Sequence, residues 1–130
     1  MTSSSTSRKA ARRQALFLLY QWDLTGQELA SLFEGEPDGF ARSLAESVAA
    51  RAADLDLRIS AASTDWPAER LGTLERNILR IGVFELEEET VPREVAINEA
   101  VVLAKRYATE DAARLVNGIL ARVAREEEAA

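Results

Sequence analysis

The segment VPREVAINEAVVLAKRYATEDAARLVNGIL, residues 91–120, carries the start and stop signals of two successive helices and decides the expected fold. Pro92 stands in what would be the first turn of the first helix, where its missing N–H costs no hydrogen bond. Glu94 follows and favours the positive end of the helix dipole. Between 95 and 108 apolar residues occupy most of the helix circumference, so we expect this helix to lie at the centre of a helical bundle.

The second helix of this segment has an equally clear beginning. Thr109 can act as its N-cap, and Glu110 and Asp111 place negative charge in its first turn. Apolar residues then recur at three- and four-residue steps, which is the spacing of one buried helix face. The expected buried stripe is Leu115, Val116, Ile119, Leu120 and Val123.

Helical periodicity and turn signals divide the rest of the chain in the same way, and no strand-like alternation competes with them. The sequence therefore predicts an all-α fold, a bundle of about six to seven helices. The expected elements are a helix from the N-cap Ser7 to Trp22 or Asp23 that Thr25-Gly26 ends, a short helix at 27–33, a turn at 34–39, a long helix at 40–62, a break at 63–67 where Asp65 can cap the next element, and a short then a longer helix within 68–88.

One glycine and the chain ends carry further expectations. Gly82 inside the helix expected up to residue 88 costs about 1 kcal/mol relative to alanine, so we expect another helix to approach closely there. Residues 1–6 are expected to form a disordered tail, and the end at 125–130 to fray into solvent. Residues 7–130 are then one all-helical domain.

The composition excludes several classes of site. The 130 residues contain no cysteine and no histidine, which removes disulfides, Cys/His zinc sites, imidazole bases and thiol nucleophiles. No Gly-rich phosphate loop and no serine–base pair occurs, so we expect no enzyme, no cofactor and no metal site. The acidic groups at 54–56, 87–89 and 126–128 are interpreted as solvated helix faces.

The location of the protein is also bounded by its composition. No apolar run approaches the roughly 20 residues that span a bilayer, and the first residues lack the apolar core of a signal peptide. Charged residues make up 29% of the chain, and the lack of cysteine fits a reducing compartment. We therefore expect a soluble, cytoplasmic protein.

The charge is distributed unevenly along the chain. The net charge is −6, yet residues 1–22 carry +4 and no acid, which leaves −10 on the remainder. A basic terminus on an acidic chain suggests a polyanionic partner for one face and a different partner elsewhere. The cations are Arg8, Lys9, Arg12 and Arg13.

On a helix these cations form a stripe beside the expected core face. They fan over about 140° at 100° per residue, and the arc continues through Leu16 to Tyr20. The stripe thus ends at an aromatic side chain with a hydroxyl group. The expected core face is Ala11, Ala15, Leu18 and Trp22, with Leu19 nearby.

The charge pattern alone leaves three interpretations open. Arginine matches phosphate in a bidentate geometry, which favours a nucleic acid. A membrane surface or an acidic protein is a second partner class, although a packed core side weakens the membrane interpretation. The third is a helix start that the cations only solubilise. Cations at a helix N-terminus are unfavourable by a few tenths of a kcal/mol each, which hints at a use for them.

A second candidate lies in AKRYATED, residues 104–111. Lys105 and Arg106 precede Tyr107 and a turn into a capped helix. Cations beside an aromatic side chain suit single-stranded RNA, whose bases stack on aromatic rings. The alternative is that Tyr107 is the last core residue of its helix.

Three segments together resemble one family along nearly the whole chain. They are RRQALFLLYQWDLTG at 12–26, LERNILRIGVFEL at 74–86 and the opening segment at 91–120, in this order and at these spacings. The chain is similar to the bacterial transcription antitermination factors of the NusB family. The block VPxxVAINEAxxLAK…VNGxL is specific, whereas the arginine-rich start alone is weak.

The resemblance implies a non-catalytic, all-helical RNA-binding protein built from two small helical subdomains. Family members bind the boxA element of ribosomal RNA leaders together with NusE, the transcription-factor form of a small-subunit ribosomal protein. The complex joins RNA polymerase, suppresses premature termination and supports ribosomal RNA synthesis. Some members form homodimers, and the sequence does not decide whether this chain does.

The resemblance also assigns residues by position. The arginine motif that would hold boxA phosphates falls on Arg8, Lys9, Arg12 and Arg13. The aromatic and the acid near RNA fall on Tyr107 and Asp111, and the NusE-facing positions fall on Tyr20 and Glu75. This chain departs from the family pattern at Leu115, which is aromatic in some relatives, and at Arg13, which is acidic in some.

Two other functions stay open at this stage. One is the related helical domain that precedes ribosomal RNA cytosine methyltransferases, against which the sequence shows no cofactor-binding domain. The other is a protein-binding helical adaptor whose arginines only solubilise it. The salt dependence of RNA binding separates these, because each phosphate contact contributes to it.

Overall fold

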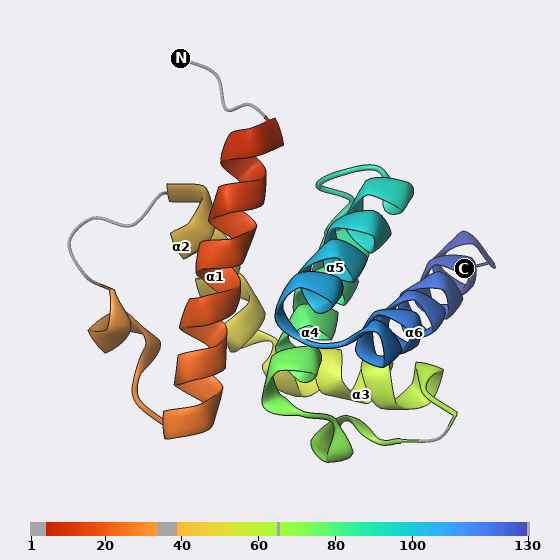
Figure 1. Ribbon diagram of the computed structural model, residues 1–130, viewed down its shortest axis with the longest axis horizontal. Helices are drawn as coiled ribbons and strands as arrows, with labels where there is room; N and C mark the ends of the chain where they lie inside the picture. Colours follow the sequence, from red (N-terminus) through yellow and green to blue (C-terminus); the bar gives the residue numbers. More distant parts are fainter. Residues whose placement is uncertain (1–4, 34–38, 65, 130) are drawn as a thin grey trace. The chain divides into compact units, whose positions relative to one another are not determined.

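The computed structural model describes residues 5–33, 39–64 and 66–129, and within them the chain forms helices and no strand (Figure 1). The all-α prediction is therefore confirmed. The α-helices are α1 (Ser5–Thr25), α2 (Gly39–Ala50), α3 (Ala52–Ala62), α4 (Thr73–Glu88), α5 (Arg93–Tyr107) and α6 (Glu110–Ala129), with 3₁₀ helices η1 (Leu29–Leu32) and η2 (Ala68–Arg70).

The chain divides into two units, Met1–Arg51 and Ala52–Ala130. The first unit holds α1, η1 and α2, and the second holds the remaining elements. The predicted long helix over 40–62 is wrong at this boundary, because α2 ends at Ala50 and α3 begins at Ala52. The Arg51 N–H is shared between the carbonyls of Ser47 and Val48, both at 3.2 Å, which tightens the end of α2. No glycine or proline marks this break, so periodicity alone did not reveal it.

In the first unit α1 packs on α2 and on η1. Small and branched side chains let the two α-helices approach, since alanine occupies several contact positions. The side chains buried in this unit include Ala11, Ala15, Leu16 and Leu19 of α1 and Ala41, Leu44, Ala45 and Val48 of α2.

The ends of α1 follow local chemistry. Gly26 adopts a φ of 75°, which suits glycine, and its N–H donates to the Trp22 carbonyl at 3.0 Å. The predicted stop at Thr25-Gly26 is confirmed. The helix begins at Ser5, so the N-cap prediction for Ser7 is wrong. The rest of the expected tail, the turn at 34–38 and the Asp65 cap lie outside the described residues.

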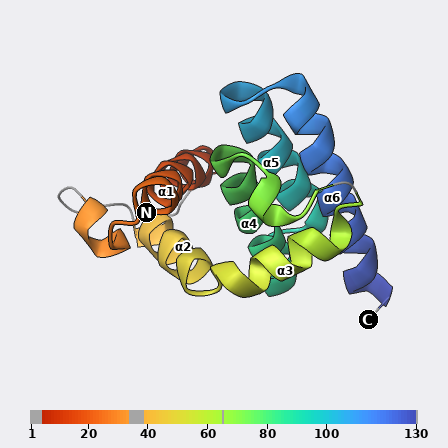
Figure 2. The same ribbon diagram turned by 90° about the horizontal axis from the view of Figure 1, so that it is seen from below.

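In the second unit α4 packs on α3, α5 and α6 and is the central helix by its burial (Figures 1 and 2). Seven consecutive residues, 77–83, are buried all around this helix. The prediction that α5 would be central is wrong, because Val95 and Val102 are 39% and 46% exposed. Its core contacts are mostly small, namely Ala96, Ala100 and Ala104 together with Leu103 and Glu99.

The two glycines inside α4 and α6 differ in their surroundings. A Cβ on Gly82 would lie 2.7 Å from Cδ1 of Leu120, so the predicted close approach of another helix is confirmed, and that helix is α6. A Cβ on Gly118 would meet no atom within 4 Å. Packing thus requires a glycine at Gly82 and not at Gly118.

The starts of α5 and α6 follow local sequence signals. Pro92 is the N-cap of α5, one position before the first turn in which it was predicted, and Glu94 lies in that first turn as predicted. Thr109 Oγ1 accepts the Ala112 N–H at 2.9 Å, which confirms the cap of α6. Glu110 and Asp111 follow in the first turn of α6.

Acidic residues hold the second unit together, which corrects their interpretation as solvated faces. Arg58 of α3 donates to Glu87 of α4 and to Glu127 of α6, each at 2.8 Å. Arg80, 5% exposed, donates to both carboxylate oxygens of Asp56 at 2.7 and 2.6 Å. The sequence hid these pairs because the partners are 24 to 69 positions apart.

These contacts also explain why the chain end does not fray as predicted. The helix α6 continues to Ala129, and Glu127 and Glu126 both lie on Arg58. Burial lowers the pKa of Arg58, but the hydrogen bonds and charges of Glu127 and Glu87 outweigh burial and raise it. Because folding raises the pKa of Arg58, its guanidinium stays charged throughout the neutral and mildly alkaline range, and the ion pairs of Arg58 with ionised Glu87 and Glu127 stabilise the fold there.

Candidate functional site

The basic end of α1 was predicted to form a stripe beside the core, and the structure places part of it in the core. Arg12 is 3% exposed, whereas Lys9 is exposed and Arg8 and Arg13 are half-buried. The guanidinium carbons of Arg8 and Arg12 lie 5.1 and 5.9 Å from the ring centroid of Phe40 on α2. Two cations over one ring fix their side chains against α2.

The buried face of α1 in the structure is rotated around the helix axis relative to the predicted core face. Leu18 and Trp22 are half-buried, whereas Leu16 and Arg12 are fully buried. At 100° per residue, Arg12 lies between the buried Ala15 and Leu16, one turn nearer the N-terminus. The aromatic ring of Phe40 lets a cation occupy this face.

A second candidate surface lies at the α5–α6 junction. Tyr107 is the last residue of α5 and is half-buried, and the Arg106 guanidinium carbon lies 5.5 Å from its ring centroid. Asp111 in the first turn of α6 is exposed and accepts a hydrogen bond from Arg114. The two-residue link at 108–109 therefore brings Tyr107 and Asp111 to one end of the second unit.

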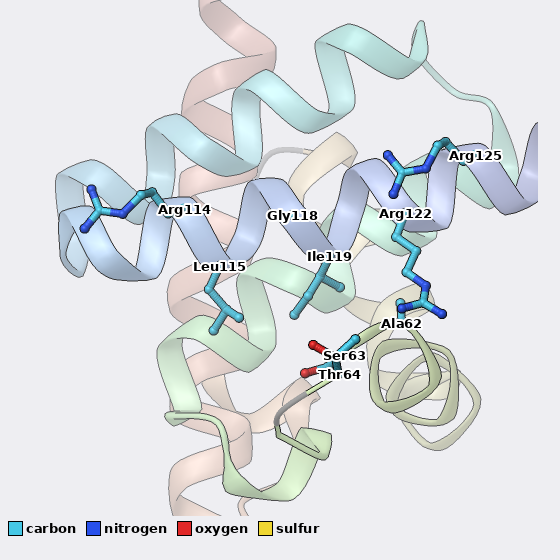
Figure 3. Close-up of a pocket in the computed structure, with 9 residues that line it drawn as sticks. All are labelled: Ala62, Ser63, Thr64, Arg114, Leu115, Gly118, Ile119, Arg122 and Arg125. Atoms are coloured by element: carbon cyan, nitrogen blue, oxygen red, sulfur yellow. The ribbon is translucent and has the colours of Figure 1, made fainter.

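A cavity of about 330 Å³ lies in the second unit between the end of α3 and one face of α6 (Figure 3). Leu115 and Ile119 point from α6 toward the Ser63 and Thr64 side chains. Three arginines belong to its lining. No local sequence pattern predicts this cavity, because its lining combines segments about 50 residues apart. Its lining is Ala62, Ser63, Thr64, Arg114, Leu115, Gly118, Ile119, Arg122 and Arg125.

The face of α1 opposite its core is apolar and aromatic. Phe17, Tyr20 and Leu24 are 44%, 36% and 60% exposed and recur at three- and four-residue steps. Sequence analysis had singled out only Tyr20. The spacing of Phe17 and Leu24 was the available signal, since it defines a second apolar stripe on one helix. A stripe of this kind suits a protein partner better than a nucleic acid.

The other predicted partner residue, Glu75, lies in the first turn of α4 and is half-buried. Its carboxylate folds back over Gly72, the N-cap of α4, at the position a Cβ would need. The carboxylate thus lies at the positive end of the helix dipole. Glu75 and Tyr20 belong to different units.

Two kinds of site find no counterpart in the part of the chain that the structure describes. No helix there is both long and apolar enough to cross a bilayer. Nor do three or more acidic side chains gather there as a metal site would require.

Similarity to known proteins covers most of the chain. The family model described as NusB family matches residues 9–125. The chain belongs to the NusB family. Seven of the predicted site residues lie within the matched region, and Arg8 lies one position before it.

Relatives and solved structures agree with the NusB assignment. The transcription antitermination protein NusB of Rubrobacter xylanophilus is 39% identical over 121 residues, covering 88% of this chain and 87% of the relative. That of Myxococcus xanthus is 36% identical over 132 residues, covering 91% and 94%.

The fold matches solved NusB structures over most of its length. A structure of T. maritima NusB superposes with a TM-score of 0.83 at 32% identity, covering 97% of this chain and 94% of that one. A crystal structure of the antitermination factors NusB and NusE in complex with dsRNA gives 0.80 at 30% identity, covering 92% and 96%.

Proposed function

We propose that this chain is a transcription antitermination factor that binds the boxA element of ribosomal RNA leaders together with NusE. The observation that carries the proposal is the NusB family match over 9–125. In support, residues 1–22 carry a charge of +4 with no acid on a chain of net charge −6. The relatives are antitermination proteins by name, and one matched structure contains NusE and RNA.

The RNA-binding role is assigned first to the basic end of α1. Lys9 is exposed and Arg8 and Arg13 are half-buried, so these three present charge to phosphate groups. Arg12 is buried over Phe40 and adds its charge to the same cluster while it fixes the direction of α1 on α2. Arg8 shares that ring, which limits its rotamers and prepares it for a phosphate.

Tyr107 and Asp111 are assigned to the RNA bases. The ring of Tyr107 already carries the Arg106 guanidinium on it, and a base stacks in the same manner. Asp111 accepts a hydrogen bond from Arg114 and is exposed, so it can also accept one from a base amino group.

The apolar stripe of α1 is assigned to NusE. Tyr20, Phe17 and Leu24 supply aromatic and aliphatic area of the kind that dominates protein interfaces. Glu75 adds a carboxylate for a cation of the partner. Bound to boxA and NusE, the protein acts without catalysis as part of the RNA polymerase antitermination complex in the cytoplasm. A homodimer of the free protein is a further state to test.

The test is a titration of labelled boxA RNA at several salt concentrations. Three phosphate contacts to single-stranded RNA, made by Arg8, Lys9 and Arg13, give a slope of log affinity against log salt near −2, at about −0.7 per phosphate. The variant Arg8→Glu/Lys9→Glu should weaken binding and flatten the slope. Arg42→Glu is the matched control, because Arg42 is an exposed cation of the same unit outside the cluster. An affinity that all variants share would contradict the proposal.

A further inference from the structure

The cavity between the end of α3 and α6 joins three arginines, two hydroxyl groups and a glycine (Figure 3). Its described lining contains no carboxylate. Arg114 and Arg122 pair with acids outside the lining, Asp111 and Glu126, and the Arg122–Glu126 distance is 3.5 Å. The cavity therefore carries a local excess of positive charge on a chain of net charge −6.

The arginines are arranged along one face of α6. Arg114, Gly118, Arg122 and Arg125 follow one another at four-, four- and three-residue steps. Arg122 and Arg125 are neighbours on the helix surface, and like charges at this spacing repel. Arg125 makes no ion pair within residues 5–33, 39–64 and 66–129. An anion between these side chains would relieve the repulsion.

Gly118 stands between the arginines at a position where packing does not require it. A Cβ there would meet nothing within 4 Å, in contrast to Gly82, whose missing side chain makes room for Leu120. Glycine inside a helix is unfavourable relative to alanine, so its use at Gly118 needs another reason. The missing side chain leaves the backbone of α6 open toward the cavity, where a ligand can approach it closely.

The opposite wall supplies hydrogen-bond donors. Ser63 Oγ accepts the Trp66 N–H at 3.2 Å, which leaves its own hydroxyl proton available to donate. Thr64 is exposed and adds a second hydroxyl group. In Figure 3, Arg122 extends from α6 toward the end of α3, whereas the hydroxyl oxygens of Ser63 and Thr64 point toward the side of Leu115 and Ile119, so the guanidinium and the hydroxyls line different parts of the cavity. Guanidinium and hydroxyl donors together are typical of a phosphate site.

We propose that this cavity binds backbone phosphates of the RNA that continues past the α5–α6 junction, with Arg122 and Arg125 as the phosphate-binding residues. The proposal rests on the proposed RNA-binding function. Continuity supports it, because Asp111 at the junction is bonded to Arg114 at the near end of the stripe. From Arg114 to Arg125 the stripe is about 16 Å long at 1.5 Å per residue, which exceeds one phosphate group and suits a strand.

The test compares two labelled RNAs, boxA alone and boxA with six further nucleotides on either side, by fluorescence anisotropy with the full chain. The variant Arg122→Gln/Arg125→Gln should reduce affinity for the extended RNA about tenfold and flatten its salt slope by about 1.4, the value for two phosphates. Gly118→Leu, which fills the open space, should reduce it in the same direction. Arg42→Gln, an exposed arginine of α2, is the control and should change affinity less than twofold. Circular dichroism of each variant checks that the helices remain.

The outcomes separate this proposal from the proposed function. If the Arg122/Arg125 variant binds both RNAs like the control while Arg8→Glu/Lys9→Glu loses boxA, the cavity does not hold RNA and the proposed function stands. If the unaltered chain binds no RNA, both fail. Inorganic phosphate is titrated separately while the amide NMR signals of Ser63, Thr64 and Gly118 are followed. Saturable shifts with phosphate but no loss of RNA affinity in the variant would assign the site to free phosphate and overturn the RNA proposal.

Discussion

The contrast between Gly82 and Gly118 yields a quantitative prediction for the packing of α4 on α6. Both glycines lie inside long helices, so replacing either by alanine should add about 1 kcal/mol of helix stability. At Gly118 no atom lies within 4 Å of the new Cβ, and Gly118→Ala should therefore keep most of that gain.

At Gly82 the gain is offset by a clash. The new Cβ would lie 2.7 Å from Cδ1 and 3.0 Å from Cδ2 of Leu120, which is fully buried. Overpacking of a core by one methyl group typically costs about 1–3 kcal/mol. Gly82→Ala should therefore be neutral or destabilising by up to about 2 kcal/mol, which places it about 1–3 kcal/mol below Gly118→Ala.

Urea unfolding followed by far-UV circular dichroism measures both free energies of unfolding. The background Leu120→Val removes the two contacting Cδ atoms, so Gly82→Ala should cost less there than in the unaltered chain. Such coupling between contacting residues is commonly about 0.5–3 kcal/mol. Equal stabilisation by the two alanines, or an unchanged effect of Gly82→Ala in the Leu120→Val background, would refute the packing of Leu120 on Gly82.

Three further predictions address ion pairs and the partner surface. Arg58→Gln should lower the free energy of unfolding by about 1–2 kcal/mol, because it removes the ion pairs of Arg58 with Glu87 and Glu127, and the loss should be constant between pH 7 and 10, since folding raises the pKa of Arg58; urea titrations at three pH values check both. Asp56→Asn should cost about 3 kcal/mol in the same assay, since it removes the ion pair of Asp56 with the buried guanidinium of Arg80, and a loss below about 1 kcal/mol would contradict the pairing. Phe17→Ser and Tyr20→Asp should each weaken NusE binding at least tenfold in calorimetry while the isolated variants keep their boxA affinity; a parallel loss of RNA binding would mean that α1 itself is disturbed.

Local signals in the sequence were sufficient for most of the fold. The Thr109 cap, the Gly26 stop and the room at Gly82 each depend on a short segment or a single contact, and each was found. The break at Arg51 was missed because the apolar repeat runs through it without a glycine or proline. The acidic pairs were missed because Arg58 and its acid Glu127 are 69 positions apart, and no local pattern links them.

The candidate site shows the same division between local and tertiary information. Charge asymmetry identified Lys9 and its neighbours, but the burial of Arg12 depends on Phe40 of another helix. Tyr20 came from the family resemblance, whereas Phe17 and Leu24 joined it only when the exposed face of α1 was known. The cavity at Arg122 required the end of α3 to be placed beside α6.

The central claim is that this chain recognises boxA RNA together with NusE. The most direct measurement is the affinity of the full chain for boxA RNA and for a scrambled RNA of equal length, each with and without NusE. The account predicts a preference for boxA that NusE increases about 5- to 150-fold, the usual range of coupling between two sites. Equal affinity for the two RNAs in the presence of NusE, or no effect of NusE on boxA binding, would contradict it.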